Sequence, residues 1–341
     1  MASLWDDLED LVHKPSSFTV KGGERGTIKP KHNFDAKDDA NALKDAIEGL
    51  GTKEKTLIEV LTQRSSAQRK LICEAYQEET GRALLDDLKG DTGGDFEDLL
   101  VALVTPPAAY DCHEVMRAMK GAGTADCVLI EIFASRSTAQ IRALNEVYLT
   151  ETEKKVTLDM KSEVSGDFAD ALLILAEGKR DESTSVDAAK AKEDAQALYE
   201  AGEKKWGTDE SKFIDILCHR GIPQLRQTLM EFKEISGKTL QESIEGEMSG
   251  ELQELLVAIV KCVKSVPAYL AELLYQSMKG GGTDEKTLTR IMVSRSEVDL
   301  LDIRTEFKKI AECSLLSYIE SDCGGDYGKT LERICGGDDE D

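Results

Sequence analysis

The chain repeats one pattern of residues four times. A Gly-Thr pair is followed 12 residues after its Thr by an Arg, and 39 residues after its Thr by an acid. The Thr residues are Thr52, Thr124, Thr208 and Thr283, the Arg residues are Arg64, Arg136, Arg220 and Arg295, and the acids are Asp91, Glu163, Glu247 and Asp322. Successive copies are 72, 84 and 75 residues apart at all three positions. Such self-similarity predicts four copies of one structural unit, each with one binding site.

The repeat intervals predict the domain organisation. We expect an N-terminal tail, four repeats and one linker, at residues 1–33 (tail), 34–105, 106–177, 178–188 (linker), 189–261 and 264–340. The linker contains the polar, breaker-rich run Gly178–Ser185. An insertion there explains why the second interval is the longest of the three.

Hydrophobic periodicity predicts helices throughout the repeats. In the first copy Phe96, Leu99, Leu100, Leu103 and Val104 follow the spacing of one helix face, and the other three copies keep this spacing. Each Gly-Thr pair precedes a second apolar series, so its Thr is expected to cap a helix, with an acid in the first turn. The acids 39 residues later are expected on loops. Alternation typical of strands is nearly absent, which predicts an all-α fold.

Composition excludes several classes of protein. No apolar stretch approaches the roughly 20 residues that a membrane-spanning helix needs. The N-terminus is acidic, which argues against a secretory signal peptide. The net charge of −23 opposes binding to nucleic acid and to bare anionic membranes.

Cysteine and histidine spacing predicts neither a disulfide framework nor a zinc site. The eight cysteines are scattered and form no C-x-x-C pair, so we expect them to be reduced and mostly buried. The four histidines show no zinc-binding spacing.

A Gly-rich turn combined with a distant acid suits a hard divalent cation. Calcium takes six to eight oxygen ligands from carboxylates, carbonyls and water, and glycines let a tight turn direct successive carbonyls at one centre. In a single copy, the glycines could simply end one helix and the acid could cap another. Four copies with the same 39-residue offset favour binding sites instead. They are not EF-hands, because the D-x-[DN]-x-[DN]-G loop is absent.

The glycine-containing segments carry a family resemblance. Met119–Thr124, Trp206–Glu210 and Met278–Glu285 resemble the calcium-binding loops of the annexin family, and the likeness covers residues 33–340. It implies four repeats of five helices each, forming a curved disc with calcium loops on its convex face. It further implies a cytoplasmic protein that binds anionic phospholipid membranes when calcium rises.

The resemblance also implies a ligand set for each calcium ion. The first site would use the carbonyls of Ile47, Gly49 and Gly51 with Asp91; the second, Met119, Gly121 and Gly123 with Glu163; the fourth, Met278, Gly280 and Gly282 with Asp322. The third site departs from this pattern, because Lys205 stands where the first Gly would be. Its set would be the carbonyls of Gly202, Lys205 and Gly207 with Glu247.

Local coordination, rather than bulk charge, would attach such a protein to lipid. Four divalent cations add eight positive charges and change the net charge only from −23 to −15. Each site commits a single carboxylate, which leaves coordination positions for phospholipid headgroups. Several sites on one face would act together.

Trp206 lies inside the third loop and has two interpretations. Tryptophan is common in protein cores, but a position beside Gly207 favours an exposed indole that enters the lipid interface.

The tail has an apolar helical stripe that begins near a Ser3–Asp6 capping pattern. Two interpretations of it remain open. It could bind an S100-type EF-hand protein, as in some members of the family, or it could pack on its own core or fray.

The sequence gives less support to two further function classes. No nucleophile–base constellation is present, so the chain is not expected to be an enzyme. A lipid-phosphate hydrolase or phospholipase-modulating activity is an alternative, and so is a calcium-dependent ion channel, although no membrane-spanning segment supports a channel.

Overall fold

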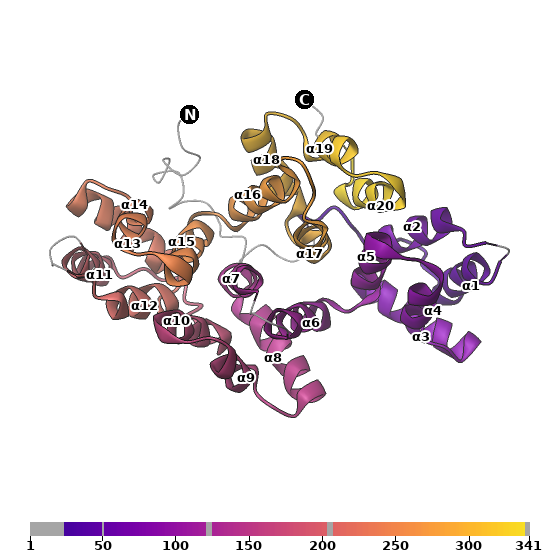
Figure 1. The fold of residues 1–341 in the computed structure, drawn as a ribbon, viewed down its shortest axis with the longest axis horizontal. Coiled ribbons are helices and arrows are strands. Elements are labelled where there is room, and N and C mark those ends of the chain that lie inside the picture. The colour runs from indigo at the N-terminus through magenta and orange to yellow at the C-terminus, as the bar shows by residue number, and fades with distance from the viewer. Residues whose placement is uncertain (1–23, 50, 121–124, 203–206, 338–341) are drawn as a thin grey trace. The chain divides into compact units, whose positions relative to one another are not determined.

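The computed structural model describes residues 24–49, 51–120, 125–202 and 207–337. All regular secondary structure in these residues is helical and comprises 20 helices (Figure 1). The prediction of an all-α fold built from four five-helix repeats is confirmed.

The first two repeats contain α1 to α10. The first repeat consists of α1 (Ala36–Ile47), α2 (Glu54–Thr62), α3 (Ser66–Thr80), α4 (Leu84–Asp91) and α5 (Gly94–Val104). The second consists of α6 (Pro107–Met119), α7 (Asp126–Ser135), α8 (Thr138–Thr152), α9 (Val156–Glu163) and α10 (Gly166–Ala176).

The last two repeats contain α11 to α20. The third repeat consists of α11 (Ala188–Ala201), α12 (Glu210–His219), α13 (Ile222–Ser236), α14 (Leu240–Glu247) and α15 (Gly250–Lys264). The fourth consists of α16 (Val266–Met278), α17 (Glu285–Arg295), α18 (Leu300–Ala311), α19 (Leu315–Asp322) and α20 (Gly325–Cys335).

Local sequence signals fix where several helices begin and end. Ser65 and Gln68 form a reciprocal capping box at the start of α3, and Ser137 and Gln140 do the same at the start of α8. At the end of α3, Gly81 adopts the left-handed conformation that glycine tolerates best. These signals set the length of the third helix before packing is considered.

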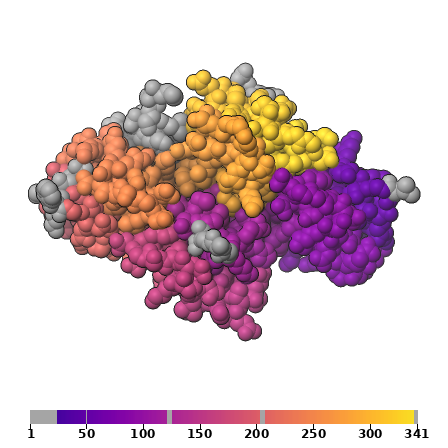
Figure 2. Space-filling view, in the orientation of Figure 1, coloured from indigo at the N-terminus to yellow at the C-terminus, as the bar shows by residue number. Residues whose placement is uncertain are grey.

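The described chain divides into two compact units. One holds Asp111–Tyr269, which is most of the second and third repeats, and the other holds residues 24–110 and 270–337, which belong to the first and fourth. In the second of these units α2 packs against α20 and α5 packs against α17, so the two repeats share one core. Figure 2 shows the surfaces of these two repeats adjoining.

The predicted apolar stripe forms part of that shared core. Leu99 and Leu100 of α5 are completely buried, and so is Leu331 of α20. Burial of each such side chain contributes about 1.5–3 kcal/mol to the free energy of unfolding. In the other unit α15 packs against both α7 and α10 in the same manner.

The segments that precede the first and third repeats are each bound to the third helix of that repeat by the same pair of hydrogen bonds. Lys31 exchanges two backbone hydrogen bonds of 2.9 Å with the side-chain amide of Gln68 on α3. Asp187 exchanges the same two bonds, also 2.9 Å, with Gln224 on α13. No helix lies between Ala176 and Ala188, where the sequence places the linker.

Candidate calcium site

Each repeat has a loop between its first and second helices, and one backbone hydrogen bond closes it. In the first repeat Lys53 N donates to Ala46 O at 2.9 Å. The equivalent bonds are Ala125 N to Ala118 O at 2.9 Å, Asp209 N to Ala201 O at 3.0 Å and Asp284 N to Ser277 O at 2.7 Å. Each Gly-Thr pair therefore lies at the end of a closed loop.

The third loop is one residue longer than the others. Its closing bond joins Asp209 to Ala201, eight positions apart, whereas the other three bonds span seven. The extra residue explains why the glycine spacing departs from the pattern in this repeat. Gly207 nevertheless keeps a positive φ of 91°, close to the 83° of Gly51, so the end of the loop turns in the same way.

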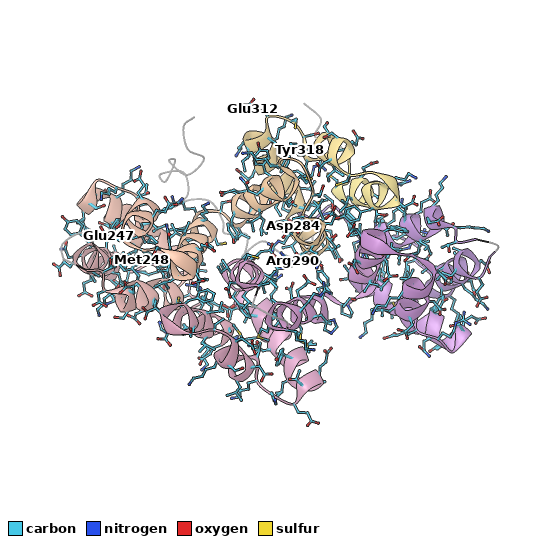
Figure 3. The ribbon with its side chains drawn as sticks, in the orientation of Figure 1. Glu247, Met248, Asp284, Arg290, Glu312 and Tyr318 are labelled. Atoms are coloured by element: carbon cyan, nitrogen blue, oxygen red, sulfur yellow. The ribbon has the colours of Figure 1, made fainter. Side chains whose placement is uncertain are left out.

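The four repeated acids are the last residues of the fourth helices, and the expectation that they lie on loops is wrong. They end α4, α9, α14 and α19, at Asp91, Glu163, Glu247 and Asp322. The first three are exposed and Asp322 is half-buried. Figure 3 shows Glu247 at the end of α14, followed directly by Met248.

The threonine of the Gly-Thr pair contacts the acid 39 residues later. The bonds are Thr52 Oγ1 to Asp91 O at 3.3 Å, Thr208 Oγ1 to Glu247 O at 3.3 Å and Oε2 at 3.5 Å, and Thr283 Oγ1 to Asp322 Oδ2 at 2.7 Å. Thr124 lies outside the described residues. The structure thus brings the turn and the acid together in three repeats, and the fixed offset in the sequence has a direct physical cause.

The hydroxyls of Thr52, Thr208 and Thr283 do not cap helices, which corrects the expectation from sequence. The N-cap of each second helix is the next residue: Lys53, Ala125, Asp209 and Asp284. Of these four side chains only Asp284 makes a capping bond, which it accepts from Thr287 N. The threonine hydroxyl bonds the acid instead. Sequence reasoning missed this role, although the constant 39-residue offset was the signal for it.

The loop lies between two helix ends of negative polarity. The first helix of the repeat ends at Ile47, Met119 or Met278, and Gly202 is the C-cap of α11. The last carbonyls of a helix have no intrahelical partner, and its dipole favours a cation there. The repeated acid stands at a second such end, where the dipole disfavours its charge. A bound cation would interact favourably with the unpartnered carbonyls of the first helix and with the negative charge of the acid.

At the fourth site the negative surroundings also affect the thiol of Cys323, which directly follows Asp322. Burial, together with the nearby Asp322 and Glu285 carboxylates, raises the pKa of the Cys323 thiol to about 12. The negative surroundings penalise a further negative charge at this position.

The donor set fits a hard cation that is held mostly by backbone oxygens. Within the described ranges, no group of three or more His, Cys, Asp or Glu side chains could hold a metal. Backbone oxygens crowd Gly49: a Cβ there would lie 3.1 Å from Asp45 O and 3.6 Å from Gly51 O. One carboxylate with several carbonyls is a calcium set, and unsuited to metals that require nitrogen or sulfur ligands.

Comparison with known protein families finds the same four units. The model of the annexin family matches residues 38–103, 110–175, 193–259 and 269–334. The chain belongs to the annexin family.

Several annexins are similar along their whole length. Annexin A3 of Homo sapiens is 55% identical over 317 residues, which are 93% of this chain and 98% of the relative. Annexin A5 of Gallus gallus is 48% identical over 93% of this chain and 98% of its own length.

Solved structures agree with these relatives. A structure of annexin III has a TM-score of 0.92 at 55% identity and covers 93% of this chain and 99% of its own. The sequence itself resembles annexin III in the run Arg290–Glu297 and in the ending Ile334–Asp339. A structure of calcium-bound annexin (Sm)1 has a TM-score of 0.81 at 34% identity, over 95% of this chain and 99% of that one.

Some of the predicted site residues of this annexin lie outside the described residues. They are Gly121 and Gly123 in the second loop and Lys205 and Trp206 in the third. The ligand sets of all four loops stay predictions, and so does the helix predicted in the tail. Among the described helices of the annexin, none is both long enough and apolar enough to cross a membrane.

Proposed function

We propose that this annexin binds anionic phospholipid membranes reversibly and only with calcium. The observation that supports this most is the contact of the Gly-Thr turn with the acid at the end of the fourth helix. It recurs in three repeats, with bonds from Thr52, Thr208 and Thr283. The calcium-bound annexin (Sm)1 among its structural relatives supports the choice of ion.

In this proposal the chain supplies only part of each coordination shell. The loop contributes backbone carbonyls, and the fourth helix contributes one carboxylate, at Asp91, Glu163, Glu247 or Asp322. When bound, calcium supplies open coordination positions that phosphate or carboxylate oxygens of a headgroup can fill. Because protein and lipid share the ion, each raises the affinity of the other by the same factor.

The threonine hydroxyl would orient the carboxylate in advance. Thr283 Oγ1 bonds Asp322 Oδ2 at 2.7 Å, which fixes the rotation of that carboxylate before an ion arrives. In the first repeat Thr52 bonds the main-chain carbonyl of Asp91 instead. We therefore propose that the fourth site is better ordered without calcium than the first.

Several weak sites on one protein would give firm but reversible attachment. Once one loop is bound, the others meet lipid at a high effective concentration, so avidity exceeds the affinity of any single site. Removal of calcium dissolves all the bridges together. The proposal therefore places the protein in the cytoplasm, with recruitment to membranes when calcium rises.

Two finer parts of the proposal rest on sequence alone. The indole of Trp206 would enter the lipid interface. The tail, with Trp5 in its apolar stripe, would offer a helix to an S100-type EF-hand protein.

Liposome co-sedimentation tests the proposed function. The full chain should pellet with phosphatidylserine vesicles in calcium, stay in solution in excess chelator, and return to solution when chelator is added later. Vesicles of phosphatidylcholine alone are the control and should bind much less protein. Equal pelleting in calcium and in chelator would contradict the proposal.

A further inference from the structure

A cavity of about 250 Å³ lies in the unit formed by the second and third repeats, beneath the linker. Phe133, Ile141 and Leu175 provide apolar walls from α7, α8 and α10. Arg180 of the linker and Ile222 at the start of α13 provide polar groups. None of these residues belongs to the calcium loops, so the cavity is independent of the function proposed above.

The equivalent place in the other unit holds a carboxylate. There, Ser66 N at the start of α3 donates to both oxygens of Glu297, at 3.0 and 2.9 Å. Arg69 Nη2 lies 3.4 Å from the same carboxylate. Through Nη1, Arg69 also bonds the carbonyls of Leu61 and Arg64 at the end of α2.

Arg180 takes the position of Arg69 in the unit with the cavity. Its Nη1 donates to Leu217 O at 2.8 Å and to Arg220 O at 2.7 Å, at the end of α12. In the repeat register, Leu217 and Arg220 stand where Leu61 and Arg64 stand in the first repeat. The two guanidinium groups thus cap equivalent helix ends in the same way.

The carboxylate, however, has no counterpart in the cavity. In the same register Ile222 stands where the first repeat has Ser66, and Thr138 of the second repeat stands where the fourth has Glu297. Thr138 lines the cavity but carries no charge. The N-cap residue of α13, Gly221, has no side chain to cap the helix start. Within the described residues, Arg180 Nη2 and Ile222 N have no hydrogen-bond acceptor.

The causes of the pKa shifts of Arg69 and Arg180 also show that only Arg69 has a carboxylate nearby. Burial lowers the pKa of Arg69, and the Glu297 carboxylate opposes that shift. Burial also lowers the pKa of Arg180, but only the thiols of Cys218 and Cys262 oppose it. Because burial raises the pKa of Cys218 to about 12, that thiol is uncharged at neutral pH. The Arg180 guanidinium thus lacks the anion that Arg69 has.

We propose that this cavity binds a small molecule with a carboxylate head and a compact apolar body. The head would receive hydrogen bonds from Arg180 Nη2 and Ile222 N, as the Glu297 carboxylate does in the other unit. The body would pack on Phe133, Ile141 and Leu175. A cavity of about 150 Å³ can hold benzene, so 250 Å³ suits a substituted benzoate or a short fatty acid.

Two acidic side chains of the linker also line the cavity, and neither replaces the missing anion. Asp181 Oδ1 accepts a hydrogen bond from Ser183 N at 2.9 Å. Glu182 lies 3.9 Å from Arg142. Both are exposed, so their charges are screened by water.

Ligand-observed ¹⁹F NMR with 4-(trifluoromethyl)benzoate tests the proposal on the full chain in chelator. The benzoate should bind, and 4-(trifluoromethyl)benzyl alcohol, with the same body and no charge, should bind at least about tenfold more weakly. Excess acetate should compete for the head position alone. Equal affinity for benzoate and alcohol, or no benzoate binding at millimolar concentration, would overturn the proposal.

Variants separate this site from binding elsewhere. Thr138→Glu should supply an internal carboxylate like that of Glu297, abolish benzoate binding and raise Tm. Ser185→Glu adds the same charge outside the cavity and should bind benzoate as the natural chain does. Arg180→Gln should weaken binding at least about tenfold, but it also uncaps α12, so Thr138→Glu decides the outcome. Unchanged affinity in Thr138→Glu would contradict the proposal.

Discussion

Arg295 and Asp299 form a buried, bidentate ion pair, in which Arg295 Nε lies 2.7 Å from Asp299 Oδ1 and Nη2 lies 2.7 Å from Oδ2. They lie four residues apart, at the turn between α17 and α18. In the other repeats the equivalent arginine pairs with an aspartate of the first helix, 25 or 26 residues upstream: Arg64 with Asp39, Arg136 with Asp111, and Arg220 with Asp194. The fourth repeat has Leu270 at the upstream position, so Asp299 replaces the lost partner.

These pairs predict large losses of stability when one partner is removed. Arg136 and Asp111 are only 1% and 9% exposed, so Asp111→Ala removes the carboxylate that neutralises a buried positive charge. We expect a loss of about 3–5 kcal/mol in the free energy of unfolding, measured by urea denaturation. Lys70→Ala, which removes one member of the exposed Lys70–Glu74 pair, is the control and should change little. Similar losses in both variants would contradict the structural role of the buried pair.

Glutamate follows the last residue of the third helix in two repeats, whereas glycine takes this position in the other two. Glu153 follows α8 and Glu312 follows α18, both with φ near 60°, whereas Gly81 and Gly237 occupy these positions in the other repeats (Figure 3 labels Glu312). A non-glycine residue in this conformation costs about 1–2 kcal/mol.

Glu153→Gly and Glu312→Gly should therefore each stabilise the fold by about 1 kcal/mol, because glycine removes this strain. Thermal unfolding measures the gain. The reverse change, Gly81→Ala, is the control and should lower Tm. A lower Tm in both glutamate variants would show that these side chains make contacts worth more than the strain.

Cysteine reactivity should follow burial. Five of the eight cysteines are buried, two are half-buried and Cys127 is exposed, which agrees with the expectation that they are mostly buried. Burial raises the pKa of Cys218 to about 12 and that of Cys73 and Cys112 to about 11. Since the thiolate is the reactive form, these three should react slowly at neutral pH.

Timed alkylation with iodoacetamide, followed by peptide mass spectrometry, measures this order. At pH 8 Cys127 should be labelled first, and Cys218 should be labelled only after denaturant is added. Raising the pH toward 10 should speed labelling of Cys73 and Cys112, because a larger fraction of each thiol is then ionised. Early labelling of Cys218 in the native protein would contradict its burial.

Much of the fold followed from the sequence, because the repeat and its helical periodicity are both local patterns. The apolar spacing that includes Leu99 and Leu100 predicted a buried helix face, and the structure confirms it. The constant offset between Thr283 and Asp322 predicted that the turn and the acid form one site, and Thr283 Oγ1 lies 2.7 Å from Asp322 Oδ2.

Other features depend on geometry that spacing does not reveal. Thr52 is a good N-cap residue by type, but its hydroxyl bonds Asp91 and the cap falls on Lys53. The partner of Arg64 was not predicted, since Asp39 lies 25 residues away on another helix. The extra residue of the third loop became visible only from the bond between Asp209 and Ala201.

Trp206 offers a test of how the third loop meets lipid. If its indole is exposed, Trp206→Ala should weaken membrane binding and leave thermal stability nearly unchanged. In a Trp5→Phe background, Trp206 fluorescence should shift to the blue with calcium and anionic liposomes together, and not with calcium alone. Truncation of a buried Trp would instead cost about 3–5 kcal/mol. Blue emission from the free protein, or such a loss of stability, would place Trp206 in the core.

The most direct test of calcium-bridged membrane binding removes the four repeated acids together. Asp91, Glu163, Glu247 and Asp322 end their helices and are exposed or half-buried, so their replacement by Ala should leave helical circular dichroism nearly intact. A matched control replaces four exposed acids away from the loops: Glu78, Glu79, Glu193 and Glu234. Both variants lose the same charge.

Calcium titration of phosphatidylserine liposome co-sedimentation should then separate the two variants. The site variant should stay in solution at every calcium concentration at which the natural chain and the control variant pellet. The same calcium dependence in the site variant as in the natural chain would show that these acids do not hold the ions, and calcium-bridged binding through them would be wrong.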